Sequence, residues 1–318
     1  MYNKLSIVIP VFNVEAYVGK TLQSVFETKA PADSFEVIVV NDGTKDGSMD
    51  IVRRYADRPN LTIVEQDNLG LSAARMKGLS KATGEYVWFI DSDDFLVSDA
   101  VVKVLNLLAE KPGVDLLMFP LKWVYEDATK DRLDYKVNEE IVVVGKSVIR
   151  DLGLPIWASQ RFVFRRSFEK NEWLYFPKEL IHEDEYFGPI LMYLSEAVLI
   201  LKDPVYFYRI RPESIISSRT IRSAYDMVSV HKQLVRFIEK GVDSDDREWF
   251  RQFCFSRLQS IYSNKYQFSP SDFCRFAFRK GFYVWHQWLK SFPGKSTRNK
   301  AGRLFYFVMP GLKDCLTG

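Results

Sequence analysis

Short apolar runs alternate with helical patterns along the first hundred residues. Runs rich in β-branched residues occupy 5–10, 35–42, 61–66 and 86–90, and such continuous apolar runs predict buried strands. Between them, apolar residues at helical spacing predict helices over 16–27, 48–55 and 71–82. Buried strands that alternate with helices are typical of a mainly parallel sheet flanked by helices. The sequence therefore predicts an α/β fold.

The rest of the chain is less regular and then becomes helical. Patterns predict helices over 101–108 and 185–194, strands at 115–119 and on either side of residues 203–204, and a hairpin at the sheet edge over 125–144. Long helical patterns follow over 221–239, 245–266 and 270–289. This change predicts a domain boundary near residue 218, with a helical C-terminal extension over 219–318.

Composition narrows the class of protein without naming its chemistry. Of the 318 residues, 47% are hydrophobic and 27% are charged, which is typical of a soluble globular protein. The net charge of +3 gives no argument for nucleic acid. Three cysteines, none in a CxxC pair, argue against a disulfide framework and a zinc site. The first apolar stretch is too short for a signal peptide, and no run of about 18 apolar residues occurs, so we expect a cytoplasmic protein.

Polar residues gather where three of the predicted strands stop. Asn13 follows the first strand, Asp42 ends the second, and Asp91, Asp93 and Asp94 follow the fourth. Ligands of parallel sheets bind at the carboxyl ends of the strands, so we expect these side chains to share one crevice. Three neighbouring carboxylates repel one another, and either a solvated turn or a divalent cation explains the cluster. Carboxylate oxygens are preferred ligands of Mg²⁺ and Mn²⁺.

Three common nucleotide or cation motifs do not fit the sequence. After the first strand the chain reads PVFNVEAY, which lacks the GxGxxG of dinucleotide-binding domains. No GxxxxGK[ST] phosphate loop occurs. Counted from Asp91, the sixth and twelfth positions are Leu96 and Val102, where a calcium-binding EF-hand needs glycine and glutamate. What remains is a carboxylate cluster that could hold a hard cation against a diphosphate.

Five segments carry a resemblance to a known family: in order, SIVIPVFN, EVIVVNDGTKDGS, EQDNLGLSAARMKG, GEYVWFIDSDD and IHEDEYF. Together they resemble the inverting family 2 glycosyltransferases with the GT-A (nucleotide-diphospho-sugar transferase) fold. Among these, the chain is similar to bacterial members that build capsule, lipopolysaccharide or teichoic acid. The resemblance implies a GT-A catalytic domain over 1–218. Its nucleotide-sugar-binding part would be about 1–100 and its acceptor part about 101–218.

The resemblance also implies which residues bind the donor. It places Pro10 and Phe12 against the base, Asp42 on the base edge, Asn68 and Arg75 at the diphosphate, Asp91 toward the ribose, and Asp93 with Asp94 at the metal. Asp42 has an alternative as a turn-forming residue, and Arg75 has one as a surface helix residue. Met76 stands where asparagine is frequent in the family, so we expect a direct contact that the family usually makes there to be missing.

A second set of residues is implied for transfer. Inversion needs a base that takes the proton of the attacking hydroxyl, and the HEDE segment matches the family's ED motif. The resemblance makes Asp184 this base and Glu183 the group that orients the acceptor; helix N-terminal capping is the alternative. Arg209 and Ser214 match a segment that closes over the diphosphate, with Arg211 as a rival for the same contact. Trp157 resembles a family position that lines the sugar or acceptor pocket, and a place in the core is the alternative.

The last part of the chain is basic and aromatic. Between residues 273 and 313 there are nine Lys or Arg, eleven aromatic residues and no Asp or Glu. Such a segment suits an anionic lipid surface on the inner face of the membrane. The alternatives are a helical cap packed on the catalytic domain or on a second subunit of a homo-oligomer, and single-stranded nucleic acid. Nothing else in the sequence supports nucleic acid.

Taken together, these expectations describe a metal-dependent inverting glycosyltransferase. It would use Mn²⁺ or Mg²⁺ and move a sugar from a nucleotide diphosphate donor, expected to be a UDP-sugar, to a hydroxyl of a growing cell-surface glycan, free or lipid-linked. Two other functions stay open. One is a catalytically inactive GT-A-like module that docks to a membrane or a partner, and the other is a nucleotidyltransferase.

Overall fold

The computed structural model describes residues 4–125, 132–211 and 221–259, and residues 280, 283, 286, 287 and 290. The chain divides into two compact units. The first comprises Met1–Glu179 and Phe187–Arg211, and the second comprises Leu180–Tyr186 and Pro212–Gly318. No helix in the described ranges combines the length and apolar character that crossing a membrane requires.

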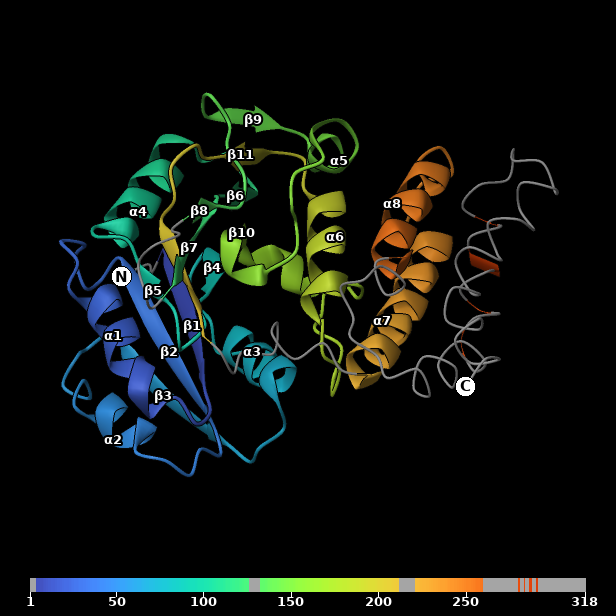
Figure 1. Ribbon diagram of the computed structural model, residues 1–318. Helices are drawn as coiled ribbons and strands as arrows, with labels where there is room; N and C mark the ends of the chain where they lie inside the picture. The colour runs from blue at the N-terminus through green and yellow to red at the C-terminus, as the bar shows by residue number, and fades with distance from the viewer. Residues whose placement is uncertain are drawn as a thin grey trace. The chain divides into compact units, whose positions relative to one another are not determined.

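An eight-stranded sheet organises the first unit, with strand order β3-β2-β1-β4-β10-β6-β11-β9. The strands β3, β2, β1 and β4 run parallel to one another, and β10 lies antiparallel between β4 and β6. Figure 1 shows β1 and β2 side by side, with α1 and α2 along them. The strands are β1 (Leu5–Val11), β2 (Phe35–Asp42), β3 (Leu61–Gln66), β4 (Tyr86–Phe89), β6 (Leu116–Met118), β9 (Ile141–Val143), β10 (Phe162–Arg165) and β11 (Val198–Ile200).

A smaller second sheet follows the order β5-β12-β7-β8. Its strands are β5 (Phe95–Leu96), β7 (Leu121–Tyr125), β8 (Arg132–Leu133) and β12 (Tyr206–Ile210). The hairpin predicted over 125–144 is wrong: β7 pairs with β8 in this small sheet, whereas β9 lies at the edge of the large sheet. The small sheet matters for the site because β12 returns from late in the sequence to pair with β5, directly after the carboxylate cluster.

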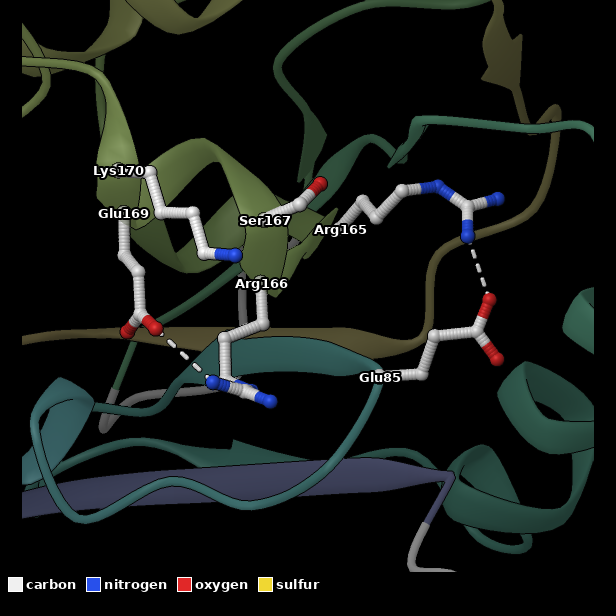
Figure 2. Close-up of a pocket in the computed structure, with 6 residues that line it drawn as sticks. All are labelled: Glu85, Arg165, Arg166, Ser167, Glu169 and Lys170. Carbon is white, nitrogen blue, oxygen red and sulfur yellow. Dashed lines mark hydrogen bonds and ion pairs between the residues drawn. The ribbon is translucent and has the colours of Figure 1, made fainter.

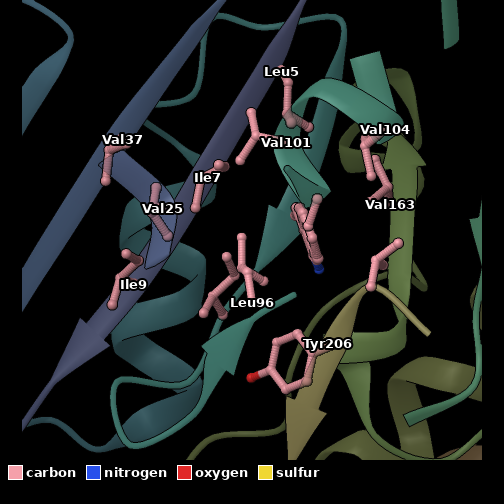
Figure 3. Packing of buried hydrophobic residues seen from close by; sticks show 14 of the residues in the cluster. Leu5, Ile7, Ile9, Val25, Val37, Leu96, Val101, Val104, Val163 and Tyr206 are labelled. Carbon is pink, nitrogen blue, oxygen red and sulfur yellow. The ribbon is translucent and has the colours of Figure 1, made fainter. Parts of the chain in front are cut away.

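Helices cover both faces of the large sheet. Residues Leu5, Ile7 and Ile9 of β1 face a cluster that includes buried residues of α1, α2 and α4, and Figure 3 shows part of this core. On the other face, Gly78 of α3 lies against Val8 and Val40 so closely that a Cβ there would meet Val8 at 2.2 Å. The first four helices along the chain are α1 (Glu15–Phe26), α2 (Ser48–Arg53), α3 (Leu71–Leu79) and α4 (Ala100–Glu110).

Shorter helical segments and three longer helices complete the described structure. They are α5 (Gly145–Ser147), η1 (Val148–Leu152), η2 (Ser159–Arg161), η3 (Arg166–Lys170), α6 (Asp184–Leu194), α7 (Ile221–Lys240) and α8 (Arg247–Gln259). In the second unit, α7 and α8 give the predicted helical character over 221–259. Phe237 of α7 and Phe250 of α8 pack edge to face at 6.0 Å, which joins the two helices through apolar contact.

Candidate functional site

Three carboxylates lie together at the carboxyl end of β4. Asp91, Asp93 and Asp94 each offer an oxygen, and these oxygens lie within 4.8 Å of one another. Asp91 and Asp93 are partly exposed, whereas Asp94 is buried. The fold brings them to the expected place, because the parallel strands β1, β2 and β4 all end at this edge.

The carboxylate of Asp94 points into the protein. It accepts a hydrogen bond from the Tyr206 hydroxyl at 2.7 Å and another from the Arg209 backbone N–H at 2.8 Å. Burial, followed by the charges of Asp93 and Asp91, raises the pKa of Asp94 well above its usual range. Asp94 therefore ties the second sheet, through β12, to the loop that carries the cluster.

Two arginines from the end of β12 reach Asp93. Arg211 forms an ion pair with the Asp93 carboxylate, and Arg209 Nε donates to the Asp93 backbone carbonyl at 2.8 Å. Both guanidinium groups lie over the ring of Tyr17, at 5.2 Å for Arg209 and 4.9 Å for Arg211. Burial and the charge of Asp91 raise the pKa of Asp93, and Arg211 opposes that rise. The structure thus brings both rival arginines to the cluster, while Ser214 lies outside the described residues.

Asp91 is held by two side chains from distant parts of the sequence. Arg75 Nη2 donates to Asp91 Oδ1 at 2.7 Å, and Gln160 Nε2 donates to Asp91 Oδ2. Arg75 is only 1% exposed and its guanidinium lies 5.1 Å from the centre of the Phe176 ring. The interpretation of Arg75 as a surface helix residue is therefore wrong. Gln160 was missed in the sequence because a lone glutamine in an aromatic, arginine-rich segment gives almost no signal.

Asp42 organises the loop that leads into α3. Its buried carboxylate accepts hydrogen bonds from Gln66 Nε2 at 2.7 Å and from the backbone N–H groups of Leu69 and Gly70 at 2.8 and 2.9 Å. These bonds agree with the alternative of a turn-forming residue. They also fix Asn68, which is exposed, beside the end of β2, where the Cβ position of Gly43 lies 2.9 Å from the Asn68 backbone nitrogen.

Phe12 and Pro10 complete this end of the site. Pro10 is buried in β1, and Phe12, directly after β1, is 41% exposed. Next to them, the backbone N–H of Asn13 donates to Thr44 Oγ1 at 2.7 Å and that of Glu15 donates to Asp46 at 2.9 Å. An aromatic face is therefore open at the end of β1, on a loop fixed by hydrogen bonds to the loop after β2.

Hydrogen bonds also set the charge state of Asp46 in this loop. Burial by itself would raise the pKa of Asp46, but hydrogen bonds from Ser48, the Glu15 backbone and Thr44 outweigh it and lower that pKa to about 2. Asp46 therefore keeps its charge to a lower pH than an ordinary aspartate, and its carboxylate supports the turn on which Phe12 sits.

The HEDE segment lies in the second unit. Asp184 and Glu185 begin α6, and Glu183 precedes it. Glu185 is buried and forms a two-pronged ion pair with Arg257 of α8, while His182 Nε2 and Ser223 Oγ of α7 are 2.8 Å apart. Glu185 and His182 therefore anchor this segment to α7 and α8. The roles expected of Glu183 and Asp184 stay predictions.

A separate polar pocket lies at the opposite end of β4 (Figure 2). Its volume is about 200 Å³, and it is lined by Glu85, Arg165, Arg166, Ser167, Glu169 and Lys170. Arg165 forms an ion pair with Glu85, and Arg166 pairs with Glu169 at 2.8 Å. Because most of its charges neutralise one another, this pocket is a weaker candidate than the carboxylate cluster.

Comparison with known proteins identifies the family. The model of the family described as "Glycosyl transferase family 2" matches residues 6–176, more than half of the chain. The chain belongs to glycosyl transferase family 2. This family 2 chain is 33% identical over 219 residues to EpsH of Bacillus subtilis strain 168, which covers 67% of the chain and 62% of EpsH. The poly(ribitol-phosphate) beta-N-acetylglucosaminyltransferase TarS of Staphylococcus aureus strain Mu50 is 25% identical over 268 residues, 81% of the chain and 46% of TarS. The chain thus spans about half to two thirds of the length of these relatives.

Solved structures show the fold of the family 2 chain. Residues 1–349 of S. aureus TarS in complex with UDP-GlcNAc superpose with a TM-score of 0.66 at 22% identity, over 96% of this chain and 81% of that one. The mannosyltransferase PcManGT of Pyrobaculum calidifontis, in complex with GDP-Man and Mn²⁺, gives 0.59 at 18% identity, over 98% and 81%. The predicted GT-A fold is confirmed.

Proposed function

We propose that this family 2 chain is a cation-dependent inverting glycosyltransferase that uses a UDP-sugar. The observation that carries the proposal is the carboxylate cluster at the end of β4, flanked by Arg75, Arg209 and Arg211. Similarity to a TarS structure that contains UDP-GlcNAc supports a UDP-sugar as donor. Arginines beside carboxylates suit a site that must bind both a cation and a diphosphate.

The donor set fits a hard divalent cation. Three carboxylates supply oxygen ligands, which Mg²⁺ and Mn²⁺ prefer, and their mutual repulsion favours a bound positive charge. Asp93 would be the principal ligand, because it is partly exposed, whereas the carboxylate of Asp94 is buried and points into the protein. When bound, the cation supplies neutralisation of the charge that develops on the departing diphosphate. A PcManGT structure with Mn²⁺ supports this assignment by similarity.

The remaining donor contacts follow the order of the strands. Phe12 offers an exposed aromatic face for the base, and Pro10, two residues earlier, is buried in β1. Asp42 would contact the base edge directly or through the loop that it holds, on which Asn68 is exposed. Arg75 would act on the donor through Asp91. Arg209 and Arg211, with Ser214, would bind the diphosphate.

Transfer requires a base for the acceptor hydroxyl. Asp184 takes the proton as the hydroxyl oxygen forms its bond to the anomeric carbon. The bond between that carbon and the diphosphate oxygen breaks, the electron pair leaves with the diphosphate, and the configuration at the carbon inverts. Glu183 orients the acceptor. The arginines at the end of β12 stabilise the negative charge of the leaving group.

The acceptor class follows from the relatives. TarS is named for transfer to poly(ribitol-phosphate), and we propose a surface glycan or teichoic-acid-like polymer for this chain. In this proposal residues 1–218 provide the catalytic domain and 219–318 the helical region. Contact of residues 273–313 with the inner face of the membrane, or with a second subunit, remains a prediction, since most of that segment lies outside the described residues.

Slow hydrolysis of UDP-GlcNAc in the presence of Mn²⁺ tests the proposal. We expect release of UDP by the unmodified protein and its loss in Asp93→Asn, because that change removes the principal cation ligand. Asp50→Asn is the matched control. Asp50 is exposed on α2, and its one ion pair within the described residues is with Arg53, at 3.1 Å. Absence of hydrolysis with every UDP-sugar tried would favour an inactive docking module instead.

A further inference from the structure

The turn that precedes β10 has an unusual backbone. Ala158 adopts φ 85°, in the region that residues with a side chain rarely occupy. Several buried bonds fix the residues around it: Arg161 Nε donates to the Trp157 carbonyl at 2.9 Å, and Trp88 Nε1 donates to the Gln160 carbonyl at 2.9 Å. Arg161 is also ion-paired with Asp134. Backbone strain that is held by its surroundings is a common feature of functional sites.

These contacts around Ala158 fix the position of the Gln160 side chain. Gln160 is only 5% exposed, and its Nε2 reaches Asp91 Oδ2, 69 residues away in sequence. Its Oε1 is buried and finds no hydrogen-bond partner among the described residues. A buried amide oxygen without a partner destabilises the fold, so an apolar side chain of the same length would suit packing better. Within the described residues, the bond to Asp91 is the side-chain hydrogen bond that requires the amide of glutamine here.

Arg75 and Gln160 act on the two oxygens of Asp91 in different ways. Arg75 brings a positive charge to Oδ1, whereas Gln160 brings a neutral N–H to Oδ2. With both oxygens held, the carboxylate keeps one orientation while each oxygen retains a lone pair for a further partner. Asp93 has its own contacts from Arg209 and Arg211 and none from Gln160 in the described structure.

We propose that Gln160 is a positioning residue for the donor, and that it acts through Asp91. Gln160 fixes the Asp91 carboxylate in the orientation that binds the nucleotide-sugar donor, and it has little influence on the cation ligand Asp93. This inference rests on the proposed function, because it takes Asp91 to be a donor contact. It separates the carboxylate cluster into a part that holds the donor, Asp91, and a part that holds the cation, Asp93.

The test is Gln160→Met, which keeps the length of the side chain and removes the donated hydrogen bond. We expect binding of UDP in the presence of Mn²⁺ to weaken by about 10- to 100-fold, the size of effect expected for loss of one hydrogen bond to a charged group. Binding of Mn²⁺ alone and the melting temperature should change little. Gln23→Met is the matched control, because Gln23 Nε2 also donates to a carboxylate, that of Glu27 at 2.8 Å, on an exposed helix surface. It should leave UDP binding unchanged.

The outcomes separate the two proposals. If the unmodified protein does not bind UDP with Mn²⁺, the UDP-dependent function fails and this inference fails with it. If the unmodified protein binds but Gln160→Met binds equally well, only the positioning role is overturned. If Gln160→Met also binds Mn²⁺ more weakly and melts at a lower temperature, the role of Gln160 is purely structural. Should Gln160→Met not fold, Gln160→Glu provides the second variant: it keeps the shape but repels Asp91, and unchanged UDP binding in it would also overturn the inference.

Discussion

The hydroxyl of Tyr206 joins the carboxylate cluster to the second sheet, and its removal has a calculable cost. In the described structure it donates to Asp94 Oδ2 at 2.7 Å and accepts from the Asp91 backbone N–H at 3.1 Å. Tyr206 is fully buried, so water cannot replace either bond, and Figure 3 shows its ring beside Leu96 at the core. A hydrogen bond to a charged group contributes roughly 1.5–3 kcal/mol and one between neutral groups roughly 0.5–1.5 kcal/mol. Tyr206→Phe should therefore lower the free energy of unfolding of the first unit by about 3 kcal/mol.

Thermal unfolding followed by tryptophan fluorescence measures this loss. For a unit of this size, about 3 kcal/mol corresponds to a fall in melting temperature of roughly 6–12 °C. Tyr55→Phe is the control, since Tyr55 stacks on Phe26 at 5.3 Å and its hydroxyl makes no hydrogen bond within the described ranges. The control should melt within about 2 °C of the unmodified protein. If Tyr206→Phe melts no lower than Tyr55→Phe, Tyr206 does not hold the cluster in place.

Three further predictions concern other charged groups. Glu185→Gln should lower the free energy of unfolding of the second unit by about 1–3 kcal/mol, measured by urea denaturation, because Arg257 loses its charged partner; no change would contradict the anchoring role. The pKa of Asp46 falls from 3.8 to about 2 on folding, so the stabilisation that its carboxylate gives the fold is present above pH 3.8 and is lost as the pH falls toward 2. The difference in free energy of unfolding between the unmodified protein and Asp46→Asn should therefore shrink over that range, and a constant difference would contradict this role. Arg211→Ala should tighten binding of Mn²⁺ alone by about fivefold, as expected for loss of a competing charge in a partly exposed ion pair, and calorimetry showing weaker binding would contradict competition at Asp93.

Local pattern was sufficient to predict the first four strands of the large sheet. The predicted bounds of β2 and β3 coincide with those of the structure, because each is one continuous β-branched run between polar turns. Prediction failed where a strand depends on distant partners. β10 lies antiparallel between β4 and β6, and nothing within Phe162–Arg165 states that pairing. The short strands between residues 121 and 143 likewise belong to two different sheets, β7 and β8 to the small one and β9 to the large one.

The candidate site shows the same division. The strand-end rule predicted that Asp42 and Asp91 would lie at one edge of the sheet, since a parallel sheet places its carboxyl ends together. The rule could not predict how each carboxylate is used. Asp42 accepts three bonds from its own loop, and Asp91 is held by Gln160 from a turn with a strained alanine. Such contacts depend on side-chain positions across the fold, which sequence spacing does not encode.

In the proposed mechanism Asp93 holds a cation that binds the donor diphosphate, while Asp184 serves the acceptor. Calorimetric titration with UDP, first with Mn²⁺ and then with a chelator, examines this division of roles. We expect binding that requires Mn²⁺, is lost in Asp93→Asn and is retained in Asp184→Asn. Binding that persists with the chelator, or that survives Asp93→Asn unchanged, would contradict it.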